Sequence, residues 1–111
     1  MLYETYKYRL EEMQRKYPEA VFIDVTRSAG SILAPSWNML NAYKKDGDWD
    51  RYTQRFTEEM QHPDCQAEMH RIGKLAERSD VFLVCFEGPR HGRKCHRFLL
   101  IDMINELMKG Q

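Results

Sequence analysis

Two cysteines, an acid, a histidine and an arginine lie close together in the last third of this chain. Cys85 and Glu87 end an apolar run, and Cys95-His96-Arg97 begins the next helical pattern. Thiol, carboxylate, imidazole and guanidinium groups serve in nucleophilic and acid–base catalysis. Open α/β sheets place their ligands at junctions between strands and helices. The spacing therefore predicts a functional site at this junction.

Cys95 is the predicted nucleophile of this site. It lies at the expected start of a helix and beside basic residues, and both features lower the pKa of a thiol below its free value of about 8.5. His96 or Glu87 is the predicted acid–base partner. Cys85 has two interpretations: it faces the crevice beside Glu87 as a further catalytic residue, or it packs in the core, where cysteine is common.

Positive side chains near the ends of two expected strands predict a site for an anion. The segment Gly88–Lys94 is basic, and a helix start follows it, so its amides and guanidinium groups suit a phosphate or a carboxylate. The predicted ligand-binding residues on both sides of the crevice are Asp24, Arg27, Ser28, Trp37, Arg93 and Arg97.

Two members of that set raise specific questions. Asp24 interrupts an apolar run, and a buried carboxylate needs a partner. That partner is either an arginine, Arg27 or Arg97, or the imidazole of His96, which Asp24 would then orient. Trp37 follows a polar turn, so among the aromatic residues of the middle of the chain it is the one expected to contact a ligand.

Zinc is an alternative occupant of the site, because Cys85, His91, Cys95 and His96 offer sulfur and nitrogen ligands within a dozen residues. Adjacent residues such as Cys95 and His96 rarely reach one ion, and the chain has no C-x-x-C pair, so no metal site is predicted. A cysteine-phosphatase loop is also excluded, because only four residues separate Cys85 from Arg90 where that motif needs five.

The elements that must position these residues alternate between strands and helices. Apolar runs rich in β-branched and aromatic residues indicate buried parallel strands, and amphipathic stretches bounded by proline, glycine or aspartate indicate helices. The expected strands cover 2–6, 20–26 and 81–86, and the expected helices cover 7–16, 35–47, 49–60, 63–78 and 94–108. A single helix over 3–16 is the competing interpretation of the first segment.

This alternation predicts an α/β fold with a small, mostly parallel sheet flanked by helices in a three-layer, Rossmann-like arrangement. The 111 residues suit one compact domain over 1–111. The loops at the carboxyl ends of the two confident strands, 24–31 and 85–97, are expected to face each other across one crevice.

Composition limits the classes of partner. Seventeen basic and seventeen acidic residues give a formal net charge of +0, so no overall field recruits nucleic acid or an anionic membrane. The charged start does not resemble a signal peptide, and no apolar stretch approaches the length of a membrane span. Three cysteines are an odd number, which favours reduced thiols over a disulfide framework. We therefore expect a cytoplasmic protein without membrane association.

The chain resembles the DUF488 family, a domain of unknown function, over nearly its whole length. The resemblance rests on Asp24-Val25-Thr26-Arg27, Leu33-Ala34-Pro35-Ser36-Trp37, the 49–60 helix, Val81 to Glu87, and Cys95-His96-Arg97. The basic insert 88–94 is longer than the family pattern. The resemblance implies a compact three-layer α/β fold and groups Cys85, Glu87, Cys95, His96 and Arg97 into one site. Neither the residues nor the resemblance identifies a cofactor, which is unknown.

Three hypotheses of function follow. The leading one is a pocket that binds a phosphorylated or nucleotide-like small molecule, with thiol-dependent catalysis by Cys95. The alternative is a non-enzymatic binding or regulatory module that acts through protein–protein contacts, with the aromatic helices as the interface of a homodimer. The weakest is association with nucleic acid, against which the zero net charge counts.

Overall fold

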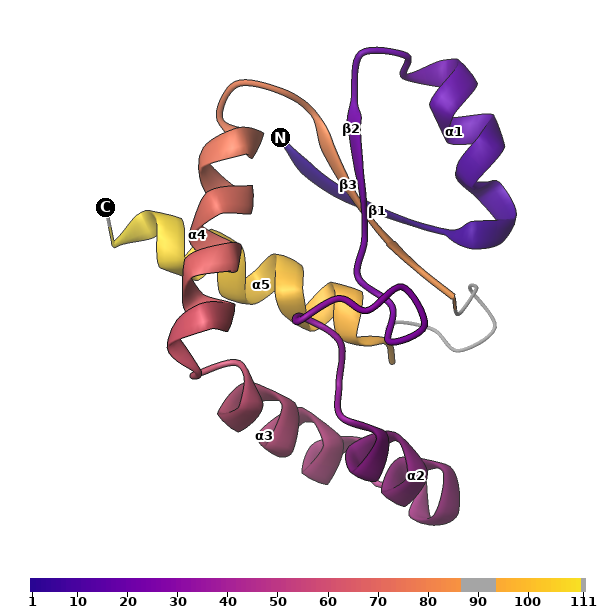
Figure 1. Ribbon diagram of the computed structural model, residues 1–111, viewed down its shortest axis with the longest axis vertical. Helices are drawn as coiled ribbons and strands as arrows, with labels where there is room; N and C mark the ends of the chain where they lie inside the picture. The colour runs from indigo at the N-terminus through magenta and orange to yellow at the C-terminus, as the bar shows by residue number, and fades with distance from the viewer. Residues whose placement is uncertain (87–93, 111) are drawn as a thin grey trace.

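The computed structural model describes residues 1–86 and 94–110, which form three strands and five α-helices (Figure 1). The strands are β1 (Leu2–Tyr6), β2 (Val21–Asp24) and β3 (Val81–Cys85). The helices are α1 (Leu10–Lys16), α2 (Trp37–Asp46), α3 (Trp49–Glu59), α4 (Pro63–Ala76) and α5 (His96–Lys109), with a 3-10 turn at Lys7–Arg9. None of these helices is both long and apolar enough to cross a bilayer.

The sheet is parallel throughout, in the order β1-β3-β2. β3 lies in the middle and all five of its residues are buried, as a near-continuous apolar run predicts. The fold class predicted from the sequence is confirmed, and the alternative of one helix over 3–16 is wrong. β2 covers Val21–Asp24 and is shorter than the expected 20–26. After Asp24, the described residues continue the pairing with β3 by one backbone bond, from the Val25 amide to the Val84 oxygen at 3.0 Å.

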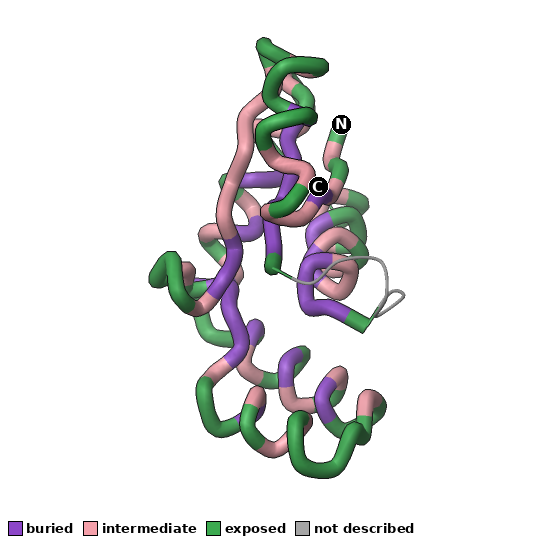
Figure 2. Tube along the Cα trace, turned by 90° about the vertical axis from the view of Figure 1, so that its right-hand side faces the viewer, coloured by how far each residue is buried: buried purple, intermediate pink, exposed green. Residues whose placement is uncertain are grey.

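Alternation along the strands divides the side chains between two faces of the sheet. The rings of Tyr3 and Phe22 stack on Phe82 between them, on the face where Tyr17 at the end of α1 also contacts Phe82. The other face carries Val81 and Leu83, which join the core formed with α4 and α5. Figure 1 shows α1 on one side of the sheet and α4 on the other, and Figure 2 shows the buried stretches between them.

Helices α2 and α3 pair with each other beyond the carboxyl ends of the strands (Figure 1). Local signals set their ends: the Ser36 side chain accepts from the Met39 amide, and the Asp48 side chain accepts from the Arg51 amide. Gly47 ends α2 at a φ of 62°, which glycine adopts without steric cost. Glu59 links the end of α3 to the start of α2, because its carboxylate accepts from both the amide and the hydroxyl of Ser36, at 3.1 and 2.6 Å.

Candidate functional site

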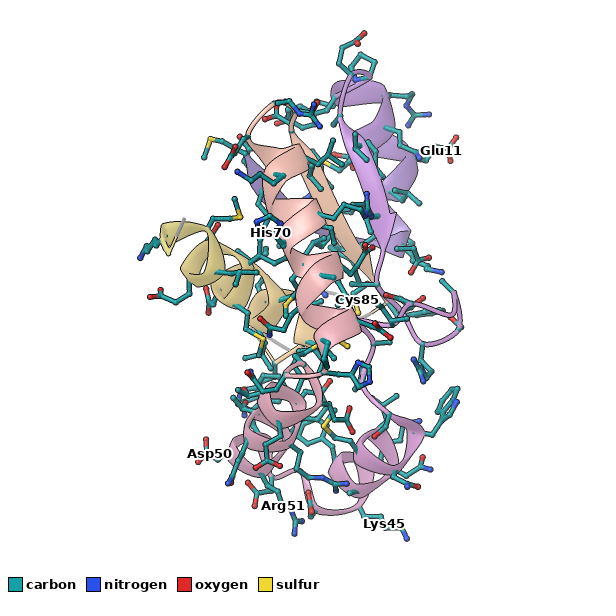
Figure 3. All side chains as sticks on the ribbon, turned by 60° about the vertical axis from the view of Figure 1, so that its left-hand side comes forward. Glu11, Lys45, Asp50, Arg51, His70 and Cys85 are labelled. Carbon is teal, nitrogen blue, oxygen red and sulfur yellow. The ribbon has the colours of Figure 1, made fainter. Side chains whose placement is uncertain are left out.

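Cys85, Cys95 and His96 converge at the carboxyl end of the central strand. Cys85 is the last residue of β3, Cys95 is the N-cap of α5, and His96 is its first helical residue. The Sγ atoms of the two cysteines lie 3.0 Å apart, and Nδ1 of His96 lies 3.6 Å from Sγ of Cys85 and 3.8 Å from Sγ of Cys95. Figure 3 shows Cys85 at the end of β3, between α4 and the α2–α3 pair.

The orientation of His96 is fixed by the backbone of the neighbouring strand end. Its Nε2 lies 2.7 Å from the carbonyl oxygen of Val25, directly after β2. A carbonyl oxygen only accepts, so Nε2 carries the hydrogen and donates it. In the neutral ring, Nδ1 is then an unprotonated acceptor that faces both thiols. The imidazole is therefore positioned to take a proton from either sulfur.

The surroundings of Cys85 favour its protonated form. The contact with Cys95 and burial raise the pKa of the Cys85 thiol well above its ordinary value, against a smaller opposing effect of His96. Cys85 and Cys95 are only 2% and 4% exposed, so a second negative charge beside a first would be poorly solvated. The geometry thus permits one thiolate in this pair, with the other sulfur as its hydrogen-bond donor.

These three residues form part of the wall of a cavity of about 290 Å³. One side of the cavity comes from the loop after β2, with Thr26, Arg27 and Ser28, and the other from Cys85 and the start of α5. The described ends of the second predicted loop, at 85–86 and 94–96, thus line one crevice with residues of the first loop. The remaining lining residues come from the turn before α2, from α2 and α3, and from the residues on either side of 87–93. They are Pro35, Trp37, Leu40, Tyr43, Lys44, Trp49, Tyr52, Phe86 and Lys94.

The α2–α3 side of the cavity is a wall of aromatic rings, which we call the aromatic wall: Trp37, Tyr43, Trp49 and Tyr52. Trp49 stacks on Tyr52 with ring centroids 4.7 Å apart, and the ring of Tyr43 contacts both of these rings. The stack continues through Phe56, which meets His96 edge-on at 5.7 Å. Trp37 is 57% exposed, which leaves its ring free to meet a ligand.

Arg27 supplies a positive charge on the opposite side of the cavity. One terminal nitrogen of its guanidinium donates to the Ser31 carbonyl oxygen at 2.9 Å. Its Nε is buried and has no hydrogen-bond partner among the described residues. A buried donor without an acceptor is costly. Arg27 also lines the cavity, so its guanidinium is a candidate contact for a bound anion. Lys94, exposed at the other rim, adds a second positive charge to the lining.

The predicted partners of Asp24 are wrong. Its carboxylate accepts from the amide and the hydroxyl of Thr26, at 2.9 and 2.6 Å, and pairs with Lys7 at 2.9 Å. Partial burial raises the pKa of Asp24, but these bonds outweigh it and hold the pKa below its ordinary value. The reason is strand alternation: Asp24 lies on the face of Phe22, away from the thiols, and the next residue, Val25, reaches His96 instead.

Arg97 lies away from the cavity lining. Its Nε donates to Oε1 of Glu4 on β1 at 2.7 Å, and its guanidinium lies over the ring of Phe98, 4.5 Å from the centroid. The side chain is 2% exposed; it pairs with Glu4, and its charge also interacts with Cys85 and Cys95. The predicted site residues Glu87 and Arg93, and the alternative ligand His91, lie outside the described residues.

Several lining residues were not predicted from the sequence. The helical spacing of Tyr43, Trp49 and Tyr52 indicates helix packing, and these residues do pack against the core, but apolar spacing does not separate a pocket wall from a core stripe. Lys94 belongs to the basic segment that signalled an anion site. The role of the Val25 carbonyl as the acceptor for His96 could not be predicted from the sequence, because every residue has a backbone carbonyl.

The Cys85, Cys95 and His96 ligand atoms lie within 4.8 Å of one another, so these three residues are also the candidate metal ligands of the described chain. Two sulfurs and one imidazole nitrogen suit zinc, which binds them at about 2.3 and 2.0–2.1 Å. A wider, more open groove of about 690 Å³ lies at the opposite end of the sheet, between Met1, Lys16–Ala20 and Glu77–Asp80. It contains no thiol or imidazole.

Comparison with protein families agrees with this geometry. The model of DUF488-N3a, described as the active DUF488-N3 subclade, matches residues 7–108. No curated protein and no solved structure matches the chain. Because the family match covers nearly the whole chain, including β2, β3, the aromatic wall and the cysteine–histidine cluster, this chain belongs to the DUF488 family.

Proposed function

We propose that this protein binds a small phosphorylated or nucleotide-like molecule in the 290 Å³ cavity and acts on it through the Cys95 thiol. One observation carries the proposal: a single cavity combines the aromatic wall, the Arg27 guanidinium and a buried thiol–imidazole cluster. A flat ring joined to an anion complements the first two features, and an electrophilic atom beside Cys95 complements the third. The description of the matching subclade as active agrees with a chemical role.

The ring of such a ligand would pack against the exposed face of Trp37. Aromatic rings stack with centroids about 4.5–7 Å apart, and each stacked base adds roughly 1–3 kcal/mol to binding. The Ser36–Glu59 hydrogen bonds hold the start of α2, and so hold Trp37, against the end of α3. The site is therefore largely formed before a ligand enters.

The anionic group would lie on the opposite side, against Arg27. The Arg27 guanidinium would donate a charge-assisted hydrogen bond to a phosphate oxygen. The hydroxyl of Ser28 lines the same side and can donate to a further oxygen, whereas the hydroxyl of Thr26 already donates to Asp24.

The chemical step assigned to Cys95 uses His96 as its base. Nδ1 takes the Cys95 proton, the thiolate forms a bond to an electrophilic atom of the ligand, and the imidazolium returns the proton to the leaving group. The Cys95 side chain makes no capping hydrogen bond to an α5 amide, so the start of α5 would favour the thiolate through the helix dipole.

The protein–protein alternative fits the geometry less well. Of the aromatic residues in the middle of the chain, Tyr52 and Phe56 are buried and Trp49 is partly buried. Trp37 alone of this group is exposed, so the helices offer a pocket wall rather than a broad apolar face.

Ligand binding is tested by tryptophan fluorescence, because both tryptophans of the chain line the cavity. Adenosine 5′-monophosphate should quench this emission at lower concentration than adenosine or inorganic phosphate. Arg27→Gln should weaken nucleotide binding by roughly tenfold, the loss of one charge-assisted bond, while Arg71→Gln, whose guanidinium pairs with Glu68 on α4, should not. If a panel of nucleotides and sugar phosphates leaves the emission unchanged, the binding proposal is wrong.

The nucleophile is tested by alkylation of the native protein with iodoacetamide across pH, followed by peptide mapping. We expect Cys95 to react at neutral pH while Cys65, buried in α4 with its thiol against the Ile32 carbonyl, stays unlabelled. A Cys95 that reacts only in the alkaline range of a free thiol would refute the catalytic part and leave the binding part standing.

A further inference from the structure

We propose that Cys85 is a resolving thiol, which forms a reversible disulfide with Cys95 after a peroxide has oxidised Cys95. The inference rests on the proposed function in one respect, that Cys95 is the reactive thiol. It adds a two-electron redox reaction and a co-reactant, hydrogen peroxide or a small organic peroxide, to the same cluster.

The distance between the two sulfurs carries the inference. Sγ of Cys85 and Sγ of Cys95 lie 3.0 Å apart, whereas a disulfide bond is about 2.05 Å long. Closing the bond therefore needs a movement of about 1 Å shared by the two side chains. The third thiol, Cys65, points to the carbonyl oxygen of Ile32, so it is not placed to compete for Cys95.

The two thiols differ in position, and the reaction requires one thiol to be oxidised first and the other to attack it afterwards. Cys95 caps α5, where a negative charge is favoured, and it reacts first. Cys85 ends β3, is 2% exposed and lies 3.0 Å from the Cys95 sulfur, so it is placed to attack that sulfur once Cys95 has been oxidised. Nδ1 of His96 lies within 3.8 Å of both sulfurs, so one base serves both steps.

Access is through the cavity. Both cysteines are almost fully buried, yet both line the 290 Å³ space, so a molecule as small as hydrogen peroxide can reach them. A folded protein with an exposed disulfide could not approach these sulfurs without rearrangement, which favours a small oxidant.

The chemistry balances in two steps. In the first, the Cys95 thiolate attacks one peroxide oxygen, the O–O bond breaks, and hydroxide leaves and is protonated to water, which makes Cys95 a sulfenic acid. In the second, Cys85 gives its proton to His96 and attacks the Cys95 sulfur; the S–O bond breaks, and the hydroxide takes that proton and leaves as water. One peroxide is reduced to two waters while the dithiol becomes a disulfide, and an external dithiol restores it.

The disulfide would switch off the proposed thiol chemistry reversibly. It ties up the nucleophile and the sulfur next to it, and it stops Cys95 short of the irreversible sulfinic and sulfonic acids. In a variant that lacks the Cys85 thiol, the sulfenic acid of Cys95 has no neighbouring thiol with which to form a disulfide, so it persists.

The test treats the reduced, chelator-washed protein with a small excess of hydrogen peroxide and maps its peptides by mass spectrometry. We expect a Cys85–Cys95 link that has lost two hydrogens, with Cys65 free, and full reversal by dithiothreitol. In Cys85→Ser and Cys85→Ala, dimedone should label most of Cys95 as sulfenic acid, where the native protein gives almost none. Cys65→Ser is the matched control and should form the link as the native protein does.

Three outcomes overturn the inference. The first is oxidation of Cys95 in the native protein to dimedone-reactive or sulfinic forms without the link. The second is a link that includes Cys65. The third is stoichiometric zinc in the isolated protein that blocks oxidation until it is chelated, which would make the cluster a metal site.

Failure here is separable from failure of the proposed function. If Cys95 is alkylated at neutral pH but no link forms, only the role of Cys85 is wrong. If Cys95 resists both alkylation and peroxide, the proposed nucleophile is wrong as well, and nucleotide quenching still tests the pocket.

Discussion

His96 donates its Nε2 hydrogen to the carbonyl oxygen of Val25 across 2.7 Å, joining the start of α5 to the end of β2. These residues are 71 positions apart in the chain. The bond turns Nδ1 toward Cys85 and Cys95, so a contact between two strand-end loops decides which ring nitrogen faces the thiols. An outer hydrogen bond of this kind fixes both the tautomer and the orientation of an imidazole.

Replacement of His96 should slow the reaction of Cys95. His96→Gln keeps a polar group near Val25 but removes the base, so we expect alkylation at neutral pH to fall by roughly tenfold to a hundredfold. The measurement is the rate of iodoacetamide labelling of Cys95 from pH 6 to 10. His70→Gln, on α4 away from the cavity lining, is the control and should keep the native rate. Equal rates in both variants would exclude His96 as the activating group.

Removal of Glu4 should destabilise the fold through Arg97. The guanidinium is 2% exposed and donates through Nε to Glu4, which is itself partly exposed. Glu4→Gln weakens a charge-assisted bond to a buried cation, so we expect the free energy of unfolding to fall by about 1–3 kcal/mol. Urea denaturation measures it.

The matched control for Glu4 is Glu12→Gln, which breaks an ion pair with Arg9 at the surface. Exposed pairs contribute about 0–1 kcal/mol, so this variant should unfold close to the native midpoint. A similar loss in both variants would mean that the burial of Arg97 does not set the cost.

The stability contributed by Asp24 should depend on pH. Its pKa is lowered in the folded state by Thr26 and Lys7, so the ionised form stabilises the fold above the unfolded-state pKa of about 3.9. That contribution is lost as the pH falls through the lowered folded-state value. Asp24→Asn should therefore be less stable than the native protein at pH 7, by a margin that shrinks toward pH 3.

Urea denaturation of the native protein and Asp24→Asn at several pH values checks this difference. Asp102→Asn, an exposed position on α5, serves as the control and should show a small margin at every pH. A margin for Asp24→Asn that grows on acidification would contradict the assignment.

Gly73 lets α4 approach α5 closely. A Cβ at this position would meet Sδ and Cγ of Met108, the latter at 2.6 Å, and Cγ2 of Ile104 at 3.3 Å. Overpacking costs about 1–3 kcal/mol, whereas alanine is favoured over glycine inside a helix by about 1 kcal/mol. Because the Met108 side chain must move to make room, and buried Ile104 limits the space on the other side, we expect Gly73→Ala to be less stable than the native protein.

The double variant separates these two effects. In a Met108→Ala background the main clash is absent, so adding Gly73→Ala should leave stability unchanged or raise it. Thermal or urea unfolding of the four proteins gives the coupling between the two sites. The same loss from Gly73→Ala in both backgrounds would rule out Met108 as the cause.

Much of the fold follows from local patterns. The apolar run at 81–86 predicts a buried central strand because every one of its side chains must leave water, and Gly47 and Asp48 predict the break between α2 and α3 because their preferred backbone and side-chain geometry suits helix ends. The DUF488 motif residues likewise indicate one site at the strand ends, and of these Cys85, Cys95 and His96 do meet at the carboxyl end of β3.

The roles within that site required the tertiary structure. Local sequence made Asp24 a candidate to orient His96, but the pleat turns Asp24 to the opposite face of the sheet and leaves the task to a backbone oxygen. Arg97 is basic and adjacent to His96, yet the turn of α5 directs it to Glu4 on β1. Composition and spacing determine which groups are available and where the strands end. Which atoms meet depends on side-chain direction and on contacts between distant segments, and those exist only when the whole domain has packed.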